Sequence, residues 1–301
     1  MTRTHDAPSA TPAIASDTAL RAGRLTTLRI HPLKSGAGVT LAEARVDPSG
    51  LRGDRRWALV DPSGANPWLG EHPRSLAIHA EAPGDGGLVL RTPGAARADL
   101  RVHPAECGPA VELDFPGLAA TALQAPDRAN SWVSEVMGAD LRLVWLPETS
   151  TRPVSPAHGG LDGEATYFAW DAPLHLVTRE SLEQLDRWIA EEAAADGREP
   201  GVDLPLDPAR FRPNLIIEGF EPFAEDQWTR VRIGELEFRV SERCDRCAVT
   251  LYDPATLAKA KEPIRTLARR RSWGGKTWFG IRLVPLTTGA LALGAPVVPL
   301  S

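Results

Sequence analysis

Apolar and polar residues alternate in short runs along this chain, and proline, glycine, aspartate or serine bounds each run. Alternation over four to eight residues between such breakers is typical of β-strands. One pair of runs flanks a turn at Gly234-Glu235 and predicts a hairpin. The predicted strands are 25–33, 57–60, 88–92, 141–146, 174–177, 215–219, 231–233, 236–240, 281–285 and 296–300.

Two segments instead repeat apolar residues every three or four positions, which is the spacing of one helix face. The first helix is expected to begin at Asp127 and to end at Gly138, and Thr178 is expected to cap the second. Their apolar faces comprise Ala129, Trp132, Val133, Val136 and Met137 in the first helix, and Leu182, Leu185 and Ile189 in the second.

The length of 301 residues and the apolar content of 43% allow one large domain or two smaller ones with proper cores. Residues 147–165 contain three prolines and three glycines and form the best linker in the chain. We therefore expect a disordered leader at 1–23, a β-rich domain at 24–146 and a second β-rich domain at 166–301. The predicted fold class is mainly β with a few helices.

The net charge of −5 argues against a general nucleic-acid or anionic-membrane surface. No apolar run is long enough to span a bilayer, and the first residues lack the apolar core of a secretory signal. The three cysteines cannot form a disulfide framework, so we expect a cytoplasmic protein with no membrane partner.

The segment SERCDRCAVT carries a CxxC pair, Cys244 and Cys247. Two close thiols suit a zinc half-site, a redox disulfide or one reactive thiolate, but they are also found as ordinary core residues. Zinc is disfavoured because no second ligand pair is present, and the strand-like AVTLYD that follows is unlike the helix of a thioredoxin motif. Arg243 and Arg246 beside the pair favour the thiolate form.

Four further motifs could carry polar chemistry, although each could also be a plain polar turn. HPLKSG at 31–36 and GDRRW at 53–57 could present an ammonium, a hydroxyl and backbone N–H groups to an oxyanion. RFRPN at 210–214 precedes a buried strand, and GKTWFG at 275–280 precedes Arg282.

Together these motifs resemble a known family. LRIHPLKSGAGVTLAEARVDPSGLRGDRRWALVD is similar to the N-terminal β-barrel domain that precedes MOSC domains, the C-terminal domains of molybdenum cofactor sulfurases. FRPNLIIEGFEPFAEDQW, the CxxC segment, DPAT, KEP and GKTWFG are similar to the MOSC domain itself. The resemblance covers about residues 24–298 and is strongest to the mitochondrial amidoxime-reducing components and their bacterial counterparts.

This resemblance implies a molybdenum cofactor, Mo-molybdopterin, at the junction of the two domains. Cys247 would be the metal ligand and the catalytic centre, whereas Cys244 would stand at a nearby non-ligating position. A thiolate suits such a metal, and bidentate arginines with a lysine suit an anionic cofactor. The implied cofactor contacts are Lys34, Ser35 and Arg55 in the first domain, and Thr178, Arg212, Asn214 and Arg246 in the second.

Two positions depart from the family pattern. Arg282 stands where the amidoxime reducers have tyrosine, and WLGEHPR at 68–74 replaces a threonine-containing segment that ends in arginine. Both are expected to border the substrate.

The function implied is reduction of N-hydroxylated compounds (amidoximes, hydroxylamines or base analogues) by oxygen-atom abstraction at molybdenum. Electrons are expected from a separate ferredoxin, flavoprotein or cytochrome, because no iron–sulfur cysteine cluster is present. One rival is a non-catalytic cofactor carrier or persulfide-handling module. The absence of a pyridoxal-phosphate domain argues against a complete sulfurase. A second rival is a β-rich binding protein that has lost the cofactor and keeps CxxC for structure.

The basic residues are distributed unevenly. Only four of the 34 basic residues are lysines: Lys34, Lys259, Lys261 and Lys276. Three of the four lie in the family motifs KS, KEP and GKTWFG. In a chain that otherwise uses arginine, this predicts that an ammonium group is specifically required, above all at Lys34 against the cofactor.

Overall fold

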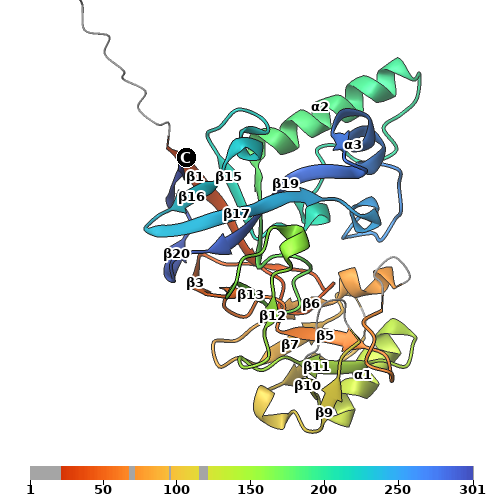
Figure 1. The fold of residues 1–301 in the computed structure, drawn as a ribbon. Coiled ribbons are helices and arrows are strands. Elements are labelled where there is room, and N and C mark those ends of the chain that lie inside the picture. The colour runs from red at the N-terminus through yellow and green to blue at the C-terminus, as the bar shows by residue number, and fades with distance from the viewer. Residues whose placement is uncertain (1–21, 68–71, 95, 115–120, 301) are drawn as a thin grey trace, which may run out of the picture.

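The computed structural model describes residues 22–67, 72–94, 96–114 and 121–300. Within these ranges the protein is mainly β with three α-helices, as predicted. Figure 1 shows a barrel in the upper half and a group of smaller sheets in the lower half. Most of the expected leader lies outside the described residues, and Gly23 already begins the first strand.

Seven strands form a closed barrel in the upper half. The ring closes at β14, which pairs in parallel with β15 and antiparallel with β19. In order around the ring the strands are β14 (Leu174–Thr178), β15 (Leu215–Glu218), β1 (Gly23–Ile30), β21 (Pro296–Leu300), β16 (Arg230–Ile233), β17 (Leu236–Asp245) and β19 (Lys276–Pro285).

The first strand of the chain belongs to this barrel and not to the sheets that follow it in sequence. β1 lies between β15 and β21 and pairs antiparallel with both. Its Leu25 and Leu28 are fully buried against the apolar interior of the barrel. Hydrogen bonds thus join β1, at the start of the predicted first domain, to strands of the predicted second domain. The domain division at 24–146 and 166–301 stays a prediction.

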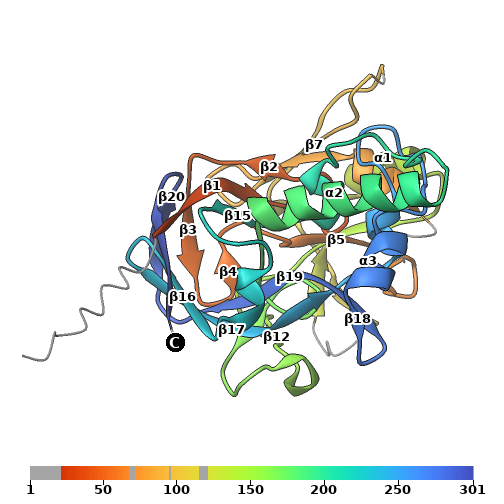
Figure 2. The ribbon, with the colours of Figure 1, turned by 90° about the horizontal axis from the view of Figure 1, so that it is seen from above.

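Strand alternation explains how the barrel acquires two apolar surfaces. In β15, Leu215 and Ile217 face the barrel interior, whereas Ile216 faces outward. The outward residues pack against α2 (Arg179–Ala195) and α3 (Ile264–Arg270), which lie along one side of the barrel in Figure 2. The α2 helix begins where predicted, because the hydroxyl of Thr178 accepts a hydrogen bond from the Ser181 amide.

The lower half combines two small sheets with α1 (Asp127–Met137). Trp132 and Val133 of α1 are buried in the core of this half. Gly138 ends the helix in the left-handed conformation, with φ 67°, which confirms the predicted end. The sheets are β5 (Trp57–Val60), β11 (Arg142–Trp145), β10 (Thr121–Gln124) and β9 (Ala110–Glu112), and β6 (His79–Glu81), β7 (Leu88–Arg91) and β8 (Leu100–Val102).

Shorter elements complete the described fold. The remaining strands are β2 (Val39–Thr40), β3 (Glu43–Asp47), β4 (Gly50–Leu51), β12 (Arg152–Pro153), β13 (Ala165–Thr166), β18 (Ser272–Trp273) and β20 (Gly289–Ala292). The 3₁₀ turns are η1 (Pro73–Ala77), η2 (Pro104–Glu106), η3 (Pro156–His158), η4 (Pro208–Phe211), η5 (Ala224–Gln227) and η6 (Ala248–Leu251).

The segment 147–165, predicted as a linker, packs closely against β17. Arg239 donates hydrogen bonds to the Glu164 carboxylate and, at 2.8 Å, to the carbonyl of Gly159. A Cβ at Gly159 would lie 2.1 Å from the Ser241 carbonyl oxygen, so only glycine permits this approach. The segment is thus anchored to the barrel.

The strand-like interpretation of AVTLYD is wrong. Residues Ala248–Leu251 form η6, because both the amide and the hydroxyl of Thr250 donate to the Cys247 carbonyl, at 3.3 and 3.0 Å. The turn redirects the chain directly after Cys247.

We predict that Leu28→Ala destabilises the whole protein by about 2–5 kcal/mol, because it opens a void in the barrel core. Leu286→Ala is the control and should cost less than about 0.5 kcal/mol, since Leu286 is 46% exposed. Urea denaturation of both variants measures the difference. Equal midpoints would contradict the place of β1 in the core.

Candidate functional site

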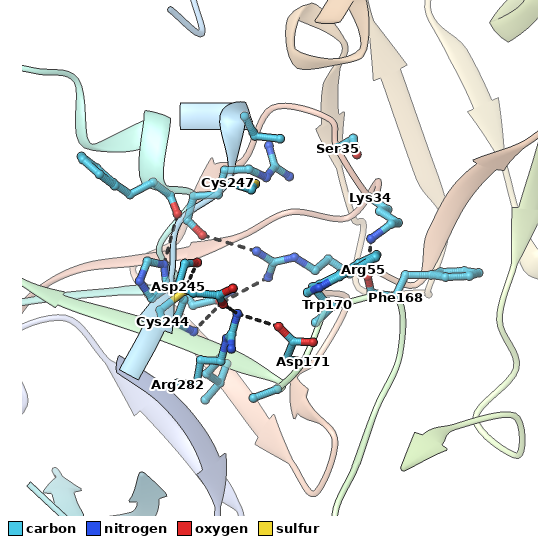
Figure 3. Close-up of a pocket in the computed structure, with 18 of the residues that line it drawn as sticks. Lys34, Ser35, Arg55, Phe168, Trp170, Asp171, Cys244, Asp245, Cys247 and Arg282 are labelled. Carbon is cyan, nitrogen blue, oxygen red and sulfur yellow. Dashed lines mark hydrogen bonds and ion pairs between the residues drawn. The ribbon is translucent and has the colours of Figure 1, made fainter. Parts of the chain in front are cut away.

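A cavity of about 420 Å³ lies between the barrel and the lower sheets (Figure 3). Its wall combines the loop after β1, Arg55 before β5, the loop before β14, the η4–β15 connection, and the end of β17 with the turn that follows it. In the view of Figure 3, Lys34 and Ser35 lie on one side and Cys244 and Asp245 on the other. Segments far apart in sequence thus meet in one site.

Most of the predicted site residues line this cavity, with one exception. Thr178 is not among the lining residues. Its buried hydroxyl caps α2 and bonds to Ser181 and Glu225, so the structure gives it a helix-capping role. The predicted residues that line the cavity are Lys34, Ser35, Arg55, Arg212, Asn214, Arg246 and Cys247.

Three of these residues have a left-handed backbone. Ser35, Arg55 and Arg212 have φ values of 68°, 47° and 54°. Such values are uncommon outside glycine and cost free energy, and they persist where the surroundings impose them. All three strained residues line one cavity, which indicates that the backbone there is held in this conformation to bind a ligand.

Asn214 holds Arg55 in place. The Asn214 side chain is fully buried, and its Oδ1 accepts hydrogen bonds from Arg55 Nη1 at 3.1 Å and from the His175 amide at 3.2 Å. Its Nδ2 donates to the Arg29 carbonyl of β1 at 3.1 Å. Arg55 also forms an ion pair with buried Asp54. The guanidinium is therefore fixed from both halves of the molecule.

The cavity crowds positive charge together. Burial, together with the charges of Arg152 and Arg55, lowers the pKa of Lys34 to about 7. Burial and the charge of Arg55 lower the pKa of Arg212 to about 9. A bound anion would offset both the mutual repulsion of these cations and the cost of burying their charge. The cavity is therefore expected to attract an anion strongly.

Among the described arginines that line the cavity, two guanidinium groups keep a buried N–H group without an acceptor. Arg212 donates through Nη1 to the Gly36 carbonyl at 2.7 Å, but its Nη2 has no partner. Arg246 donates through Nη2 to the Phe211 carbonyl at 3.0 Å, but its Nε has none. Buried donors of this kind fit an oxygen-rich ligand.

The two thiols of the CxxC pair have different surroundings. Cys247 is exposed, whereas Cys244 is buried. Burial alone would raise the pKa of Cys244, but Arg246, His175 and Arg282 lower it well below its ordinary value. Arg246 Nη1 lies 2.9 Å from the Cys244 sulfur. These three groups favour the thiolate form of Cys244 in the wall, whereas Cys247 borders the cavity with an exposed thiol.

Arg282, which is expected to stand where the amidoxime reducers have tyrosine, is buried in the cavity wall among carboxylates. Its Nη2 lies 2.6 Å from an Asp171 oxygen and 2.5 Å from an Asp245 oxygen, and its Nη1 pairs with Glu242. A tyrosine could not neutralise these three groups. Positions 68–71 of the second departing segment lie outside the described residues.

Sequence reasoning missed several lining residues. Trp170 and Asp171 precede β14 in a segment without a motif, and His175 lies within a plain apolar strand. Trp170 is 55% exposed, and its ring lies 5.2 Å from Lys34 Nζ. In the sequence, the signal that could have pointed to this wall of the cavity is a tryptophan followed directly by an aspartate, Trp170-Asp171, just before the predicted strand.

The donor set fits an anionic, sulfur-liganded cofactor. The cavity lies within the usual range for small-molecule sites and offers an exposed thiol, crowded cations and unsatisfied N–H donors. These are the groups that a molybdopterin would require, namely a thiolate for the metal and cations for the phosphate.

Comparison with known families agrees with this geometry. Residues 22–140 match the model of the MOSC N-terminal β-barrel domain, and residues 157–298 match the MOSC domain. The chain contains a MOSC N-terminal β-barrel domain followed by a MOSC domain. The resemblance found in its motifs is thereby confirmed.

The relatives of this MOSC protein carry two kinds of name. The molybdenum cofactor sulfurase of Danio rerio is 28% identical over 91% of the chain, which spans about a third (34%) of that relative. The mitochondrial amidoxime-reducing component 1 of Homo sapiens is 26% identical over 91% of the chain and 82% of that protein. Both names support a molybdenum-related function.

Among solved structures, the YuaD protein of Bacillus subtilis aligns with 92% of the chain and 94% of its own, at 12% identity and a TM-score of 0.38. No helix in the described ranges is long and apolar enough to cross a membrane. The cytoplasmic location stays a prediction.

We predict that sulfate protects this MOSC protein against heat more at pH 6 than at pH 8. The folded-state pKa of Lys34 is lowered to about 7, so this ammonium is charged below that pH and lost above it. A ligand that binds the folded state raises Tm in proportion to its affinity. The difference in protection should be about 2 °C or more.

Lys34→Met should abolish the pH dependence of this protection, and exposed Lys261→Met should retain it. Thermal unfolding with and without sulfate measures the effect. Equal protection of the parent protein at both pH values would contradict the charge crowding.

Proposed function

We propose that this MOSC protein is a molybdenum-cofactor-dependent reductase of N-hydroxylated compounds such as amidoximes and hydroxylamines. One observation carries the proposal: an exposed thiol, Cys247, borders the same cavity as the crowded cations Lys34, Arg55 and Arg212. A relative that spans most of this chain is named an amidoxime-reducing component, which supports the same reaction class.

The residues have separable roles in this proposal. Cys247 holds the metal, and Lys34, Ser35, Arg55, Arg212 and Arg246 bind the phosphate and polar edges of the cofactor. When bound, the molybdenum centre supplies the two-electron chemistry that removes oxygen from N–OH. Overall, the N–OH group, two electrons and two protons yield N–H and water.

The substrate meets the chain's own groups at the cavity wall. Trp170 offers an exposed aromatic face on which a planar amidoxime can stack. Burial raises the pKa of Asp171, partly offset by Arg282, so this carboxyl holds a proton more readily than an exposed one. Asp171 also lines the cavity, so in this proposal it exchanges a proton with the N–OH group while Arg282 stabilises its carboxylate form.

A second candidate function rests on Cys244. A Cys244 thiolate, which Arg246 and Arg282 favour, can attack the outer sulfur of a persulfide donor, so that the donor leaves as a thiolate and Cys244 becomes the persulfide. The sulfurase relatives match over most of this chain. In that case the protein carries the cofactor or its sulfur without turnover. Bound molybdenum with no amidoxime reduction in the parent protein would favour this candidate.

Cys247→Ala should remove molybdenum and lower amidoxime reduction more than about a hundredfold. Loss of a residue that only supports a metal ligand typically costs about 10- to 100-fold, and loss of the ligand itself should cost more. The measurements are metal content by mass spectrometry and turnover of a model amidoxime with a chemical reductant. Cys107→Ala is the matched control, because Cys107 lies in the lower half and outside the cavity.

The control should keep both metal and activity. A Cys247→Ala protein that contains as much molybdenum as the parent and reduces the amidoxime at the parent rate would refute the proposal.

A further inference from the structure

A second, open groove of about 530 Å³ lies on the surface beside η6 and α3. We call it the η6–α3 groove. Its floor contains the apolar Leu251 and Ile264, and its rim contains basic residues. The lining residues are Leu251, Lys259, Ala260, Lys261, Ile264 and Arg265.

The rim carries positive charge that the protein leaves uncompensated. Lys259 and Lys261 are exposed, and neither has a carboxylate within ion-pair distance in the described part of the chain. Elsewhere many exposed arginines are paired, as Arg24 is with Glu218 and Arg128 with Glu106. Lys259 Nζ also lies 5.3 Å from the centroid of the Tyr252 ring, a cation–π contact that leaves the positive charge of this lysine uncompensated.

The nearby carboxylates are already occupied. Glu262 is fully buried and pairs with Arg265 at 2.7 Å and with Arg198 at 3.5 Å. Asp253 pairs with buried Arg210 at 2.7 Å. Each acid is matched by at least one arginine, so the ammonium groups of the two lysines remain as excess charge at the rim.

One short turn connects the groove to the cavity. Val249 of η6 lines the cavity, and Leu251 of the same turn lines the groove. At about 2 Å of rise per residue, η6 spans only about 8 Å. Hydrogen bonds continue this path, from the Thr250 amide to the Cys247 carbonyl and from the Ala260 amide to the Leu251 carbonyl.

From this placement we infer that the η6–α3 groove is the docking surface for an acidic electron-transfer protein. The inference rests on the proposed reductase function, which requires two electrons per turnover. An apolar floor with a charged rim suits a transient partner, because rim charges steer the encounter and the floor holds the complex. The groove shares no lining residue with the cavity, so substrate and donor can bind together.

The test variant is Lys259→Glu/Lys261→Glu. The matched control is Arg101→Glu/Arg232→Glu, which changes the net charge equally at two exposed arginines on β8 and β16. The probe is an acidic [2Fe–2S] ferredoxin. Its binding to each protein is measured by calorimetry at low ionic strength and again with added salt.

The lysine variant should bind the ferredoxin about tenfold more weakly than the parent protein, and the control should bind it nearly as the parent does. Added salt should weaken the binding of the parent. Failure of the parent to bind the ferredoxin, or equal losses in both variants, would overturn the docking surface.

A kinetic arm separates this inference from the proposed function. Ferredoxin-driven reduction of the amidoxime should fall in the lysine variant, while reduction driven by a small viologen should be unchanged. A parent that fails with the viologen contradicts the reductase proposal, whereas the binding measurement still decides the docking surface.

Discussion

The side-chain amide of Asn214 is buried, and its hydrogen bonds join the barrel to the lower half beside the cavity. The side chain joins β1 through Arg29, β14 through His175 and the lower half through Arg55. A buried amide with partners on three segments is costly to disturb, because each partner would lose its hydrogen bond in a low-dielectric interior. Asn214 therefore links the end of β1 in the barrel to the guanidinium of Arg55 in the cavity.

The cavity beside Asn214 lowers the free energy of unfolding, because it contains crowded cations and strained backbone. Cations are close enough to lower one another's pKa, as at Lys34 and Arg212, and three residues adopt left-handed backbones. Proteins retain such strain where a ligand uses it. Binding of the anionic, thiolate-liganded cofactor that we propose would give these features one common explanation.

Local signals in the sequence predicted the elements well, and motifs predicted much of the cavity. The helix ending at Gly138 and the helix capped by Thr178 follow from periodicity and capping alone. The pairing of β1 with β15 does not, because it joins residues far apart in sequence and no local pattern encodes a long-range partner.

The same limit applies to the site. The residues that the family motifs assign to the cofactor line the cavity, except Thr178, which caps α2, and their roles toward a cofactor stay predictions. Asp171 and Trp170 were missed because they belong to no motif and reach the cavity only through the loop before β14. The turn after Cys247 depends on the Thr250 hydroxyl, which the apolar pattern of AVTLYD conceals.

The most direct test of this account is anomalous diffraction at the molybdenum edge, on crystals of protein isolated with its cofactor. The account predicts a molybdenum peak within bonding distance of the Cys247 sulfur, in the cavity that Lys34 and Arg212 border. A peak at Cys244 or outside this cavity, or no peak in crystals of protein isolated from cells that make the cofactor, would contradict it.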